Sequence, residues 1–525
     1  MENNGRGSWG STIGFLLSAI GSAVGLGNIW GFPYKMGKCG GFSFFIVYIA
    51  LAVFVGLVIM VAELAMGRKT GTGVVGAYRK MSKKYSWVGW LGIIAPFLIM
   101  SFYTVLGGYC LQYMCLNAAE MAFGVGNGIF ADVSGGTTFG SMLSSPAGCV
   151  IFTALFMLIN MGIVKAGVSG GIEKFNKIGM PALFIMLCII IVRSLTLPNS
   201  IEGLKFMFVP GYAVSAGFIA EQPDFISVLG TAGGQMFFSL SLAMGVMITY
   251  GSYLKKGEDL VKNAGVIVFS DTLVAVMAGI AVIPAAVANG IMNGVAVGDI
   301  SLNGPKLLFV TLQDVFAQMG TFGPLFGVIF YALVLIAAIS SSISLTEVIS
   351  AFFIDKDVEK GKEPNREKIV LWVNIAIMVE AALVAVCCLG ETGIAPADLL
   401  FWKDTPLYAT WNDCWLDFMD FFSEGVAMPL GAMLCSLMIG WDIKPRAILE
   451  EVNFGNESHK FRKFFKFCIR YICPLAMAFV FAGQLIDFLT PISGAYSVRG
   501  VAYAVPVIIL VAYFVISVIN NKNPD

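Results

Sequence analysis

The sequence contains little charge for its length. Aspartate, glutamate, lysine and arginine make up 13% of the 525 residues, whereas about 25% of the residues of a typical soluble domain are charged. The formal net charge is zero, and His459 is the only histidine. No basic patch of the kind that binds nucleic acid is present, so we expect no nucleic-acid partner. Most of the chain must instead face lipid or other buried helices.

Cysteine is present but follows no recognisable pattern. The eleven cysteines show neither the spacing of a metal site nor that of a disulfide framework. We expect those in apolar runs to be small core residues: Cys110, Cys188, Cys387, Cys388 and Cys435. The Asn-X-Ser sequon at Asn456 to Ser458 lies in a basic segment. Because we assign this segment to the cytoplasm, we expect no glycosylation there.

Long hydrophobic runs dominate the sequence, in which 58% of the residues are hydrophobic. Seven uncharged runs approach or exceed the ~20 residues that cross a bilayer as a helix: Gly7–Tyr34, Cys39–Ala62, Tyr85–Ala119, Val133–Val164, Phe225–Leu254, Val315–Thr346 and Gly500–Asn521. Shorter runs near 178–197, 264–290, 368–389, 413–441 and 468–490 bring the expected number of spans to twelve. A membrane barrel would show alternating segments of ~10 residues instead. The sequence therefore predicts an all-α membrane protein.

Lysine and arginine are unevenly distributed among the loops, and positive flanks stay in the cytoplasm. The loop between the third and fourth runs has none, whereas three segments are rich in them: 68–84, 356–368 and 444–470. We therefore expect a multi-pass protein of the inner (plasma) membrane with both termini in the cytoplasm. No short signal peptide with a cleavage site precedes the first run, so we expect this run to remain in the mature protein.

Two of the runs contain residues that interrupt a helix. The first expected span contains AIGSAVGLGNIWGFPY (Ala19–Tyr34). The sixth expected span, counted along the chain, contains GGQMFFSLSLAMGVMITY (Gly233–Tyr250). A glycine alone more often marks close packing between membrane helices. Two interrupted spans in corresponding halves indicate a repeat with a ligand site near the middle of the bilayer. Unwinding leaves backbone groups unsatisfied in lipid, and a cation and a carboxylate can satisfy them.

The segment GSAVGLGNIWGFPY resembles the first span of the neurotransmitter:sodium symporters, which typically reads G-x-A-V-G-L-G-N-x-W-R-F-P-Y. The similarity continues in GGFSFFIVYIALAVFVGLVIMVAELAMGR (Gly40–Arg68), in GGQMFFSLSL and in ISSSIS (Ile339–Ser344). The chain is similar to the prokaryotic amino-acid transporters of this family. The resemblance implies a leucine-transporter-type fold with discontinuous helices 1 and 6. Its parts would be a gate segment at 1–9, a five-helix repeat at 10–197, an inverted repeat at 225–441, and two further helices at 464–521.

The resemblance also implies two sodium sites built from oxygen ligands, which suit a hard cation. The first would comprise Ala23, Asn28, Ser239, Asp271 and the carboxylate of the substrate. The second would comprise the carbonyls of Gly21, Val24 and Ala337 and the hydroxyls of Ser340 and Ser341. From the residues alone, serines in this run are better explained by packing or by a bond to the preceding helical turn. Only the family pattern assigns Ser340 and Ser341 to the ion.

The residue at position 25 indicates the class of substrate. Family members that carry amines have an aspartate here, so a glycine implies a substrate with its own carboxylate, namely an amino acid. The resemblance implies a pocket of Ala23, Gly25, Gly27, Ile99, Tyr103, Phe238, Ser239, Ser241, Met244, Ser341 and Leu345. Tyr103 would bind the carboxylate. The pocket has no ionised side chain and Met244 is adaptable, so we expect neutral, hydrophobic amino acids. Helix packing is the alternative for each residue, and for Ile99 or Leu345 alone it is the favoured one.

The seventh span carries a single ionisable residue, Asp271, and such residues usually mark an ion or proton path. Family members commonly have asparagine here and, when they depend on chloride, a serine four residues later, where this chain has Ala275. We expect Asp271, with Tyr48, Gln235 and Ser239 around it, to ligate sodium and to replace chloride as a fixed negative charge. Chloride would then not be required. Proton binding to Asp271 after sodium leaves is a further hypothesis.

The outer gate departs from the family pattern. Gly31 stands where the family usually has an arginine that pairs with an acidic residue of span ten, here Asp420. We expect Lys35, one helical turn later, to take over part of that pairing. Other acidic residues near membrane depth are expected to have structural or interfacial roles: Glu63, Glu347, Glu380, Asp417 and Glu424.

The inner gate follows the family pattern more closely. Arg6 and Trp9 match its motif, Asp355 is at the position of the acidic partner, and Tyr253 would support the pair. Arg6 alone is also explained as a positive flank of the first span.

These features together predict a sodium-coupled symporter of neutral amino acids. It would work by alternating access, with no enzymatic chemistry and no cofactor other than Na⁺ at the two expected sites. A ligand-gated channel, which needs a continuous polar pore, and a sensor that binds without transport are the alternatives. Sodium-dependent uptake into liposomes separates them, because a channel gives no uphill accumulation and a sensor binds without uptake.

Overall fold

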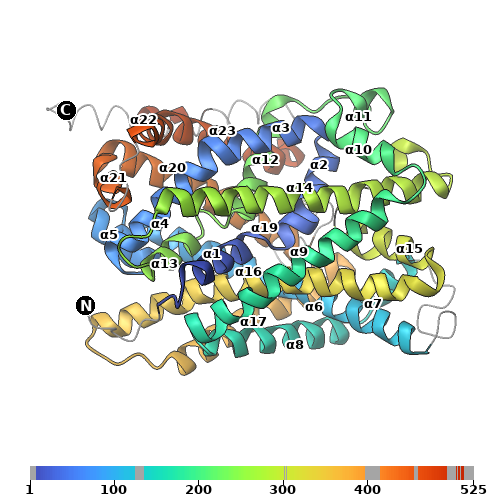
Figure 1. Cartoon of the computed structure of the whole chain (residues 1–525), viewed down its shortest axis with the longest axis horizontal. Coiled ribbons are helices and arrows are strands. Elements are labelled where there is room, and N and C mark those ends of the chain that lie inside the picture. The colour runs from blue at the N-terminus through green and yellow to red at the C-terminus, as the bar shows by residue number, and fades with distance from the viewer. Residues whose placement is uncertain are drawn as a thin grey trace.

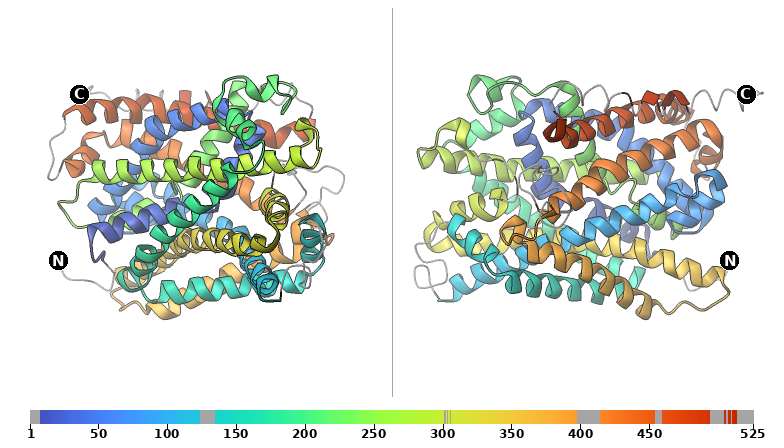
Figure 2. Two further views of the ribbon diagram at one scale, coloured as in Figure 1. Left: turned by 45° about the vertical axis from the view of Figure 1, so that its right-hand side comes forward. Right: turned by 180° about the vertical axis from the view of Figure 1, so that it is seen from behind.

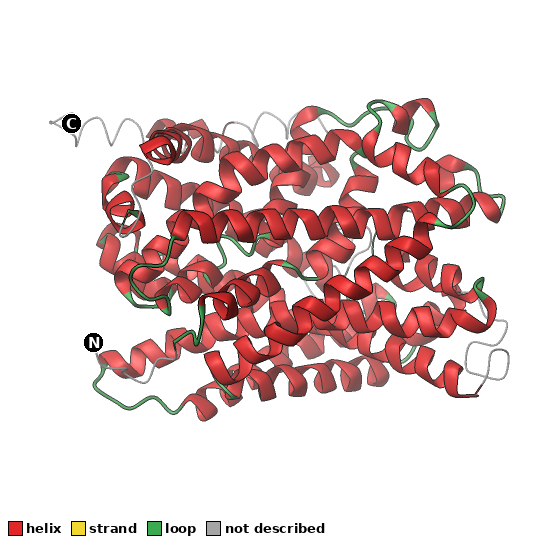
Figure 3. Cartoon of the chain, in the orientation of Figure 1, coloured by secondary structure: helices red, strands yellow, loops and turns green. Residues whose placement is uncertain are grey.

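The computed structural model describes residues 8–123, 135–300, 302, 304, 306–396, 414–453, 459–493, 504, 507, 508 and 510–512. Regular secondary structure in these residues is entirely helical, as Figure 3 shows. This confirms the all-α prediction.

Among the described residues, nine continuous helical segments are long and apolar enough to cross a membrane: Phe42–Thr70, Lys83–Phe123, Pro146–Lys165, Val168–Leu195, Leu260–Met292, Gly320–Glu359, Arg366–Gly390, Trp415–Asp442 and Phe461–Ile486. Their principal helices are α3 (Phe42–Leu51), α4 (Leu57–Thr70), α6 (Val88–Phe123), α8 (Pro146–Lys165), α9 (Lys174–Leu195), α14 (Leu260–Met292), α16 (Gly323–Glu359), α17 (Arg366–Cys387), α19 (Trp415–Asp420), α20 (Met428–Leu437), α22 (His459–Phe467) and α23 (Cys473–Ser493).

Two further helical segments of the described chain are broken. A bent pair, Thr12–Ala23 and Gly27–Lys38, forms the first span with an angle of 45° between its halves. The sixth consists of α12 (Phe225–Ser239) and α13 (Val246–Ser252). The run Gly500–Asn521 lies almost wholly outside the described residues, so the count of twelve spans stays a prediction.

Burial divides the spans into inner and outer ones. Only 33% of the apolar window of Pro146–Lys165 is buried, as against 72% for Lys83–Phe123 and 83% for Trp415–Asp442. Helix α6 packs extensively against α16 at the centre. Helix α9 runs obliquely across the bundle and contacts α1 (Thr12–Ala23), α14 and α16 (Figures 1 and 2). Helix α16 also contacts α1 of the first broken span and α13 of the sixth.

The connecting helices gather at the two ends of the bundle. Figure 1 places α5 (Val74–Met81) and α21 (Arg446–Val452) at one end, and α7 (Gly135–Leu143), α10 (Ser200–Phe208), α11 (Tyr212–Ser215) and α15 (Leu312–Ala317) at the other. The first two belong to basic segments of the sequence. The charge pattern and the fold therefore agree on which loops share a side, while the compartment that each side faces stays a prediction.

Candidate functional site

The first span breaks after Ala23. Val24 has extended backbone (ψ 90°) and ends α1, a π-helical turn follows at Gly27–Gly31, and α2 (Phe32–Lys38) begins with Pro33 near its start. Side chains bind the backbone amides that the break leaves free. The amide of Gly25 donates to Asn28 Oδ1 at 3.1 Å, and that of Leu26 donates to the hydroxyl of Tyr103 at 2.9 Å. The discontinuity expected in helix 1 is confirmed.

The break in the sixth span lies between Ser239 and Val246. Ser241 (φ 52°) and Ala243 (φ 59°) have left-handed backbone, which costs a non-glycine residue about 1–2 kcal/mol. The amide of Ala243 donates to Glu63 Oε1 of α4 at 2.8 Å, and Glu63 is fully buried. Glu63 therefore has the structural hydrogen-bonding role expected of it. Strained backbone at a buried break is typical of functional sites.

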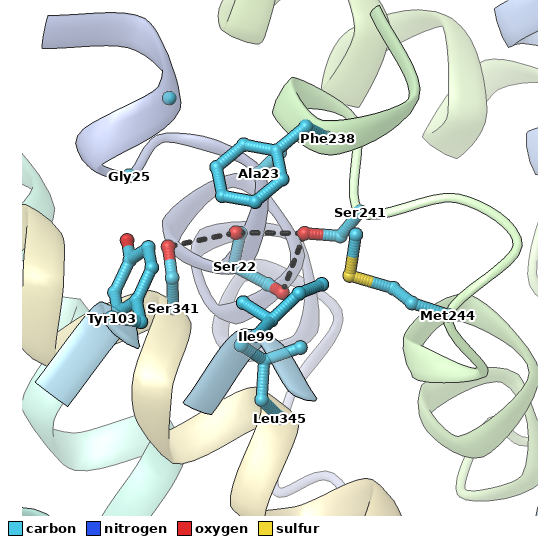
Figure 4. A pocket seen from close by; sticks show the side chains of 11 residues that line it. Ser22, Ala23, Gly25, Ile99, Tyr103, Phe238, Ser241, Met244, Ser341 and Leu345 are labelled. Carbon is cyan, nitrogen blue, oxygen red and sulfur yellow. Dashed lines mark hydrogen bonds between the residues drawn. The ribbon is translucent and has the colours of Figure 1, made fainter. Parts of the chain in front are cut away.

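The two breaks enclose a cavity of about 270 Å³ (Figure 4). It is lined by Ser22, Ala23, Gly25, Gly27, Ile99, Tyr103, Phe238, Ser241, Met244, Ser341 and Leu345. The structure thus brings all of the expected pocket residues except Ser239 around one cavity, and none of the lining side chains is ionised.

Ser22 was not among the expected pocket residues. Its carbonyl accepts hydrogen bonds from Ser241 Oγ at 2.9 Å and from Ser341 Oγ at 3.0 Å, and its hydroxyl lies 3.2 Å from that of Ser241. The only sequence feature that could have indicated Ser22 as a pocket residue is its position directly before the segment AVG. Ser22 links span one to spans six and eight through these bonds.

Glycine at 25 keeps the backbone close to the polar end of the cavity. A Cβ there would lie 2.3 Å from Ser341 Oγ and 2.5 Å from the hydroxyl of Tyr103. The apolar side chains of the lining are Ile99, Phe238, Met244 and Leu345 (Figure 4). The cavity therefore suits a ligand with one polar end and one apolar end.

A buried carboxylate lies beside this cavity. Asp271 of α14 is 0% exposed, and its carboxylate accepts hydrogen bonds from Asn28 Nδ2 at 2.7 Å, Ser239 Oγ at 2.9 Å and the hydroxyl of Tyr48 at 3.3 Å. Gln235 donates to the carbonyl of Gly27 at 2.7 Å, and its own Oε1 has no partner among the described residues. The cluster contains oxygen atoms and a negative charge but no basic side chain, so its chemistry suits a hard monovalent cation.

The second expected sodium set is partly assembled. Ser340 Oγ lies 2.9 Å from the carbonyl of Ala337 and 3.5 Å from that of Val24. Ser341 Oγ instead donates to Ser22, and Gly21 faces Asn176 of α9. In the described part of the chain no group of three or more His, Cys, Asp or Glu side chains could hold a metal.

A model of the sodium:neurotransmitter symporter family matches residues 6–123 and 143–521. The chain belongs to this family. YhdH, an uncharacterized sodium-dependent transporter of Bacillus subtilis (strain 168), is 34% identical over 486 residues, which cover 92% of this chain and 98% of YhdH. The human sodium- and chloride-dependent neutral and basic amino acid transporter B(0+) is 24% identical over 564 residues, covering 94% and 82% of the two chains.

The fold also matches a solved structure. The crystal structure of MhsT in complex with L-phenylalanine has a TM-score of 0.77 and 33% sequence identity, and the match covers 91% of this chain and 100% of the MhsT chain. The leucine-transporter-type fold is therefore established for this symporter family member.

Lys35, which is expected to contribute to the outer gate, contacts an acidic residue of span ten. The ammonium group of Lys35 forms an ion pair with Glu424, and both side chains are nearly buried. The expected partner, Asp420, lies one helical turn earlier on the same span. Lys35 therefore contacts span ten through Glu424, and its part in a pairing with Asp420 stays a prediction.

The structure brings some of the residues that we expect at the inner gate into contact. The indole of Trp9 donates to the carbonyl of Tyr250 at 3.1 Å and packs edge-on against Tyr253. The hydroxyl of Tyr253 donates to Glu347 at 2.8 Å. Asp355 accepts a bond from the amide of Gly73 at 2.7 Å. Arg6, its expected partner, lies outside the described residues.

Proposed function

We propose that this chain is a sodium-coupled symporter that carries neutral, apolar amino acids by alternating access. The pocket at the two helix breaks is the observation that carries the proposal, because it joins a polar end to uncharged apolar walls. A zwitterion with an apolar side chain matches that division. The structure of MhsT with L-phenylalanine supports the same class of substrate.

The amino acid lies with its carboxylate toward the first break. There the hydroxyl of Tyr103 and the amides near Gly25 and Gly27 provide donors, and no carboxylate side chain lines the cavity to repel the ligand. Its side chain points toward Ile99, Met244 and Leu345. Met244 adapts its shape easily, so several apolar and aromatic amino acids fit.

Sodium binds beside the substrate, at Asn28, Ser239 and Asp271 with the carbonyl of Ala23 and the carboxylate of the substrate. A second Na⁺ binds Gly21, Val24, Ala337, Ser340 and Ser341. Each ion that moves inward contributes about 2.3 kcal/mol per 100 mV of membrane potential. Asp271 balances the charge of the nearby ion, so transport requires no chloride.

Alternating access moves the repeats at 10–197 and 225–441 relative to each other. Lys35 and Glu424 close the outer side, with Asp420 nearby. Trp9, Tyr253 and Asp355 close the inner side together with Arg6 of the gate segment at 1–9. Helices 11 and 12, at 464–521, lie outside the two repeats. The protein spans the inner membrane with both termini in the cytoplasm.

Uptake by purified protein in liposomes tests the proposal. With Na⁺ outside and K⁺ inside, labelled L-phenylalanine should accumulate above its external concentration, and replacing external Na⁺ with K⁺ should abolish accumulation. Replacing chloride with gluconate should leave the rate within about twofold, because Asp271 already balances the ion charge. Equal uptake without Na⁺, or Na⁺-dependent binding without uptake, would contradict the proposal.

A further inference from the structure

Helices α8 and α17 pack side by side (Figure 1). Cys149 lies in the first turn of α8, and Cys388 directly follows the last residue of α17. Their sulfur atoms are 3.8 Å apart, although 239 residues separate them in the chain, and no covalent bond joins them in the structure. The packing of span four against span nine therefore brings two thiols into direct contact.

Both cysteine side chains are 0% exposed. The sulfur of Cys149 lies 3.6 Å from the carbonyl oxygen of Met142, and the sulfur of Cys388 lies 3.2 Å from that of Ala385. Thiols are weak hydrogen-bond donors, so these contacts contribute little to the packing. A buried cysteine ordinarily serves as a small core residue, but that role does not require a second sulfur in contact with the first.

The backbone at the end of α17 is strained. Cys388 (φ 45°) and Leu389 (φ 57°) both have left-handed backbone, which is unfavourable for residues that carry a Cβ. Such backbone persists only where the surrounding structure holds it in place. This turn places the sulfur of Cys388 against the start of α8, so a bond between the two sulfurs would hold the turn in its strained conformation.

Both cysteines lie at the end of the bundle away from the basic segments. Helix α8 follows α7, one of the connecting helices at that end (Figure 1). The basic segment 356–368 precedes α17 and includes its first residues, so Cys388 lies at the opposite end of that helix. The distribution of lysine and arginine predicts that this end faces away from the cytoplasm. Disulfides form and persist there, whereas thiols in the cytosol are kept reduced.

We propose that Cys149 and Cys388 are a modification site, at which oxidation forms a disulfide that links span four to span nine. The two thiols lose two electrons and two protons as the S–S bond forms, and an oxidising protein disulfide accepts them and becomes a dithiol. Because both thiols are 0% exposed once the helices have packed, this exchange takes place during folding, before α8 and α17 close on each other. The proposal uses the predicted membrane orientation and is independent of sodium coupling.

Disulfide mapping of the full chain tests the proposal. Whole cells are dissolved in sodium dodecyl sulfate with N-ethylmaleimide, so that every unbonded thiol is blocked, including those that were buried. The protein is then purified and digested without reductant. Of the eleven cysteines, Cys149 and Cys388 should be joined in one cross-linked pair of peptides, which separates when reductant is added. The maleimide on both residues, or a bond from either to Cys387 or Cys414 instead, would overturn the proposal.

The melting temperature in detergent gives a second readout. Because the bond forms during folding, protein made in cells grown with dithiothreitol should lack it and melt a few degrees lower than protein made without the reductant. Cys149→Ala and Cys388→Ala should each remove this difference. Cys435→Ala is the matched control and should keep it, since Cys435 is 1% exposed and its sulfur contacts the thioether of Met66.

An equal response to dithiothreitol in the unaltered protein and in Cys149→Ala would overturn the proposal, because a bond that the variant cannot form would then not be the cause. The mapping uses the unaltered chain, so it decides even if a variant does not fold. Neither measurement involves transport. A failure of the proposed sodium coupling is therefore a different result from a failure of this proposal.

Discussion

Two oxygen atoms occupy the space in which a side chain at Gly25 would lie. They belong to Ser341 and Tyr103, which line the polar end of the pocket. We expect Gly25→Ala to fold normally, because Gly25 does not have positive φ. Binding of amino acids should weaken at least about tenfold, since the methyl group displaces the groups that would hold the carboxylate.

Equilibrium binding of labelled L-phenylalanine checks this prediction, with thermal unfolding as the test of folding. Ser436→Ala is a suitable control. Ser436 lies away from the pocket, so this substitution should not change the affinity. A Gly25→Ala protein with unaltered affinity would show that the ligand does not bind at the first break.

Glu63 stabilises the second break by accepting the amide of Ala243. Glu63→Ala leaves that amide unpaired within the membrane, and such a loss costs about 1–3 kcal/mol. We therefore expect a lower melting temperature in detergent for Glu63→Ala. Glu63→Gln keeps an acceptor oxygen and should retain most of the stability. Equal losses for both variants would show that the carboxylate charge, and not the hydrogen bond, stabilises the break.

Individual residues differ in how far sequence could predict them. The resemblance of the first, third, sixth and eighth spans to one family sufficed to choose side chains that surround a common cavity, although their roles stay predictions. Glu63 could not be matched to Ala243, because 180 residues separate them and only the packed fold brings them together.

At the scale of elements, Lys35 of α2 links the first span to span ten through Glu424. Removing one member of a buried ion pair leaves the other charge unpaired, which costs about 3–5 kcal/mol. We expect Lys35→Met to lower both stability and uptake. The reversed pair, Lys35→Glu with Glu424→Lys, should recover most of both.

Melting temperature and sodium-driven uptake are the measurements for these variants. The reversed pair with Asp420, Lys35→Glu with Asp420→Lys, is compared with the reversed pair with Glu424. If the Asp420 pair rescued uptake and the Glu424 pair did not, Asp420 would be the residue that pairs with Lys35 during transport.

The breaks in spans one and six were predictable as elements, because glycine, asparagine and proline interrupt otherwise apolar runs. The exact ion pair that Lys35 forms with span ten was not predictable. Asp420 and Glu424 lie one turn apart on the same span, so the sequence identifies the face but not the residue.

At the scale of the whole molecule, hydrophobic runs alone predict a helical membrane protein, because each run is long enough to span a bilayer. Basic segments predict which loops share an end, and the positions of α5 and α21 agree (Figure 1). The oblique course of α9 and the central pairing of α6 with α16 could not be predicted, since uniformly apolar helices carry no periodic signal to orient them. These packings place the two broken spans side by side.

The central claim is that the two helix breaks bind Na⁺ and an amino acid together. The affinity of purified protein for labelled L-phenylalanine, measured over a series of Na⁺ concentrations at constant ionic strength with K⁺, tests it most directly. Binding should tighten as Na⁺ rises, and the amino acid should increase the affinity for Na⁺ by the same factor, because coupling between two sites is reciprocal. An affinity that is the same in Na⁺ and in K⁺ would contradict the account.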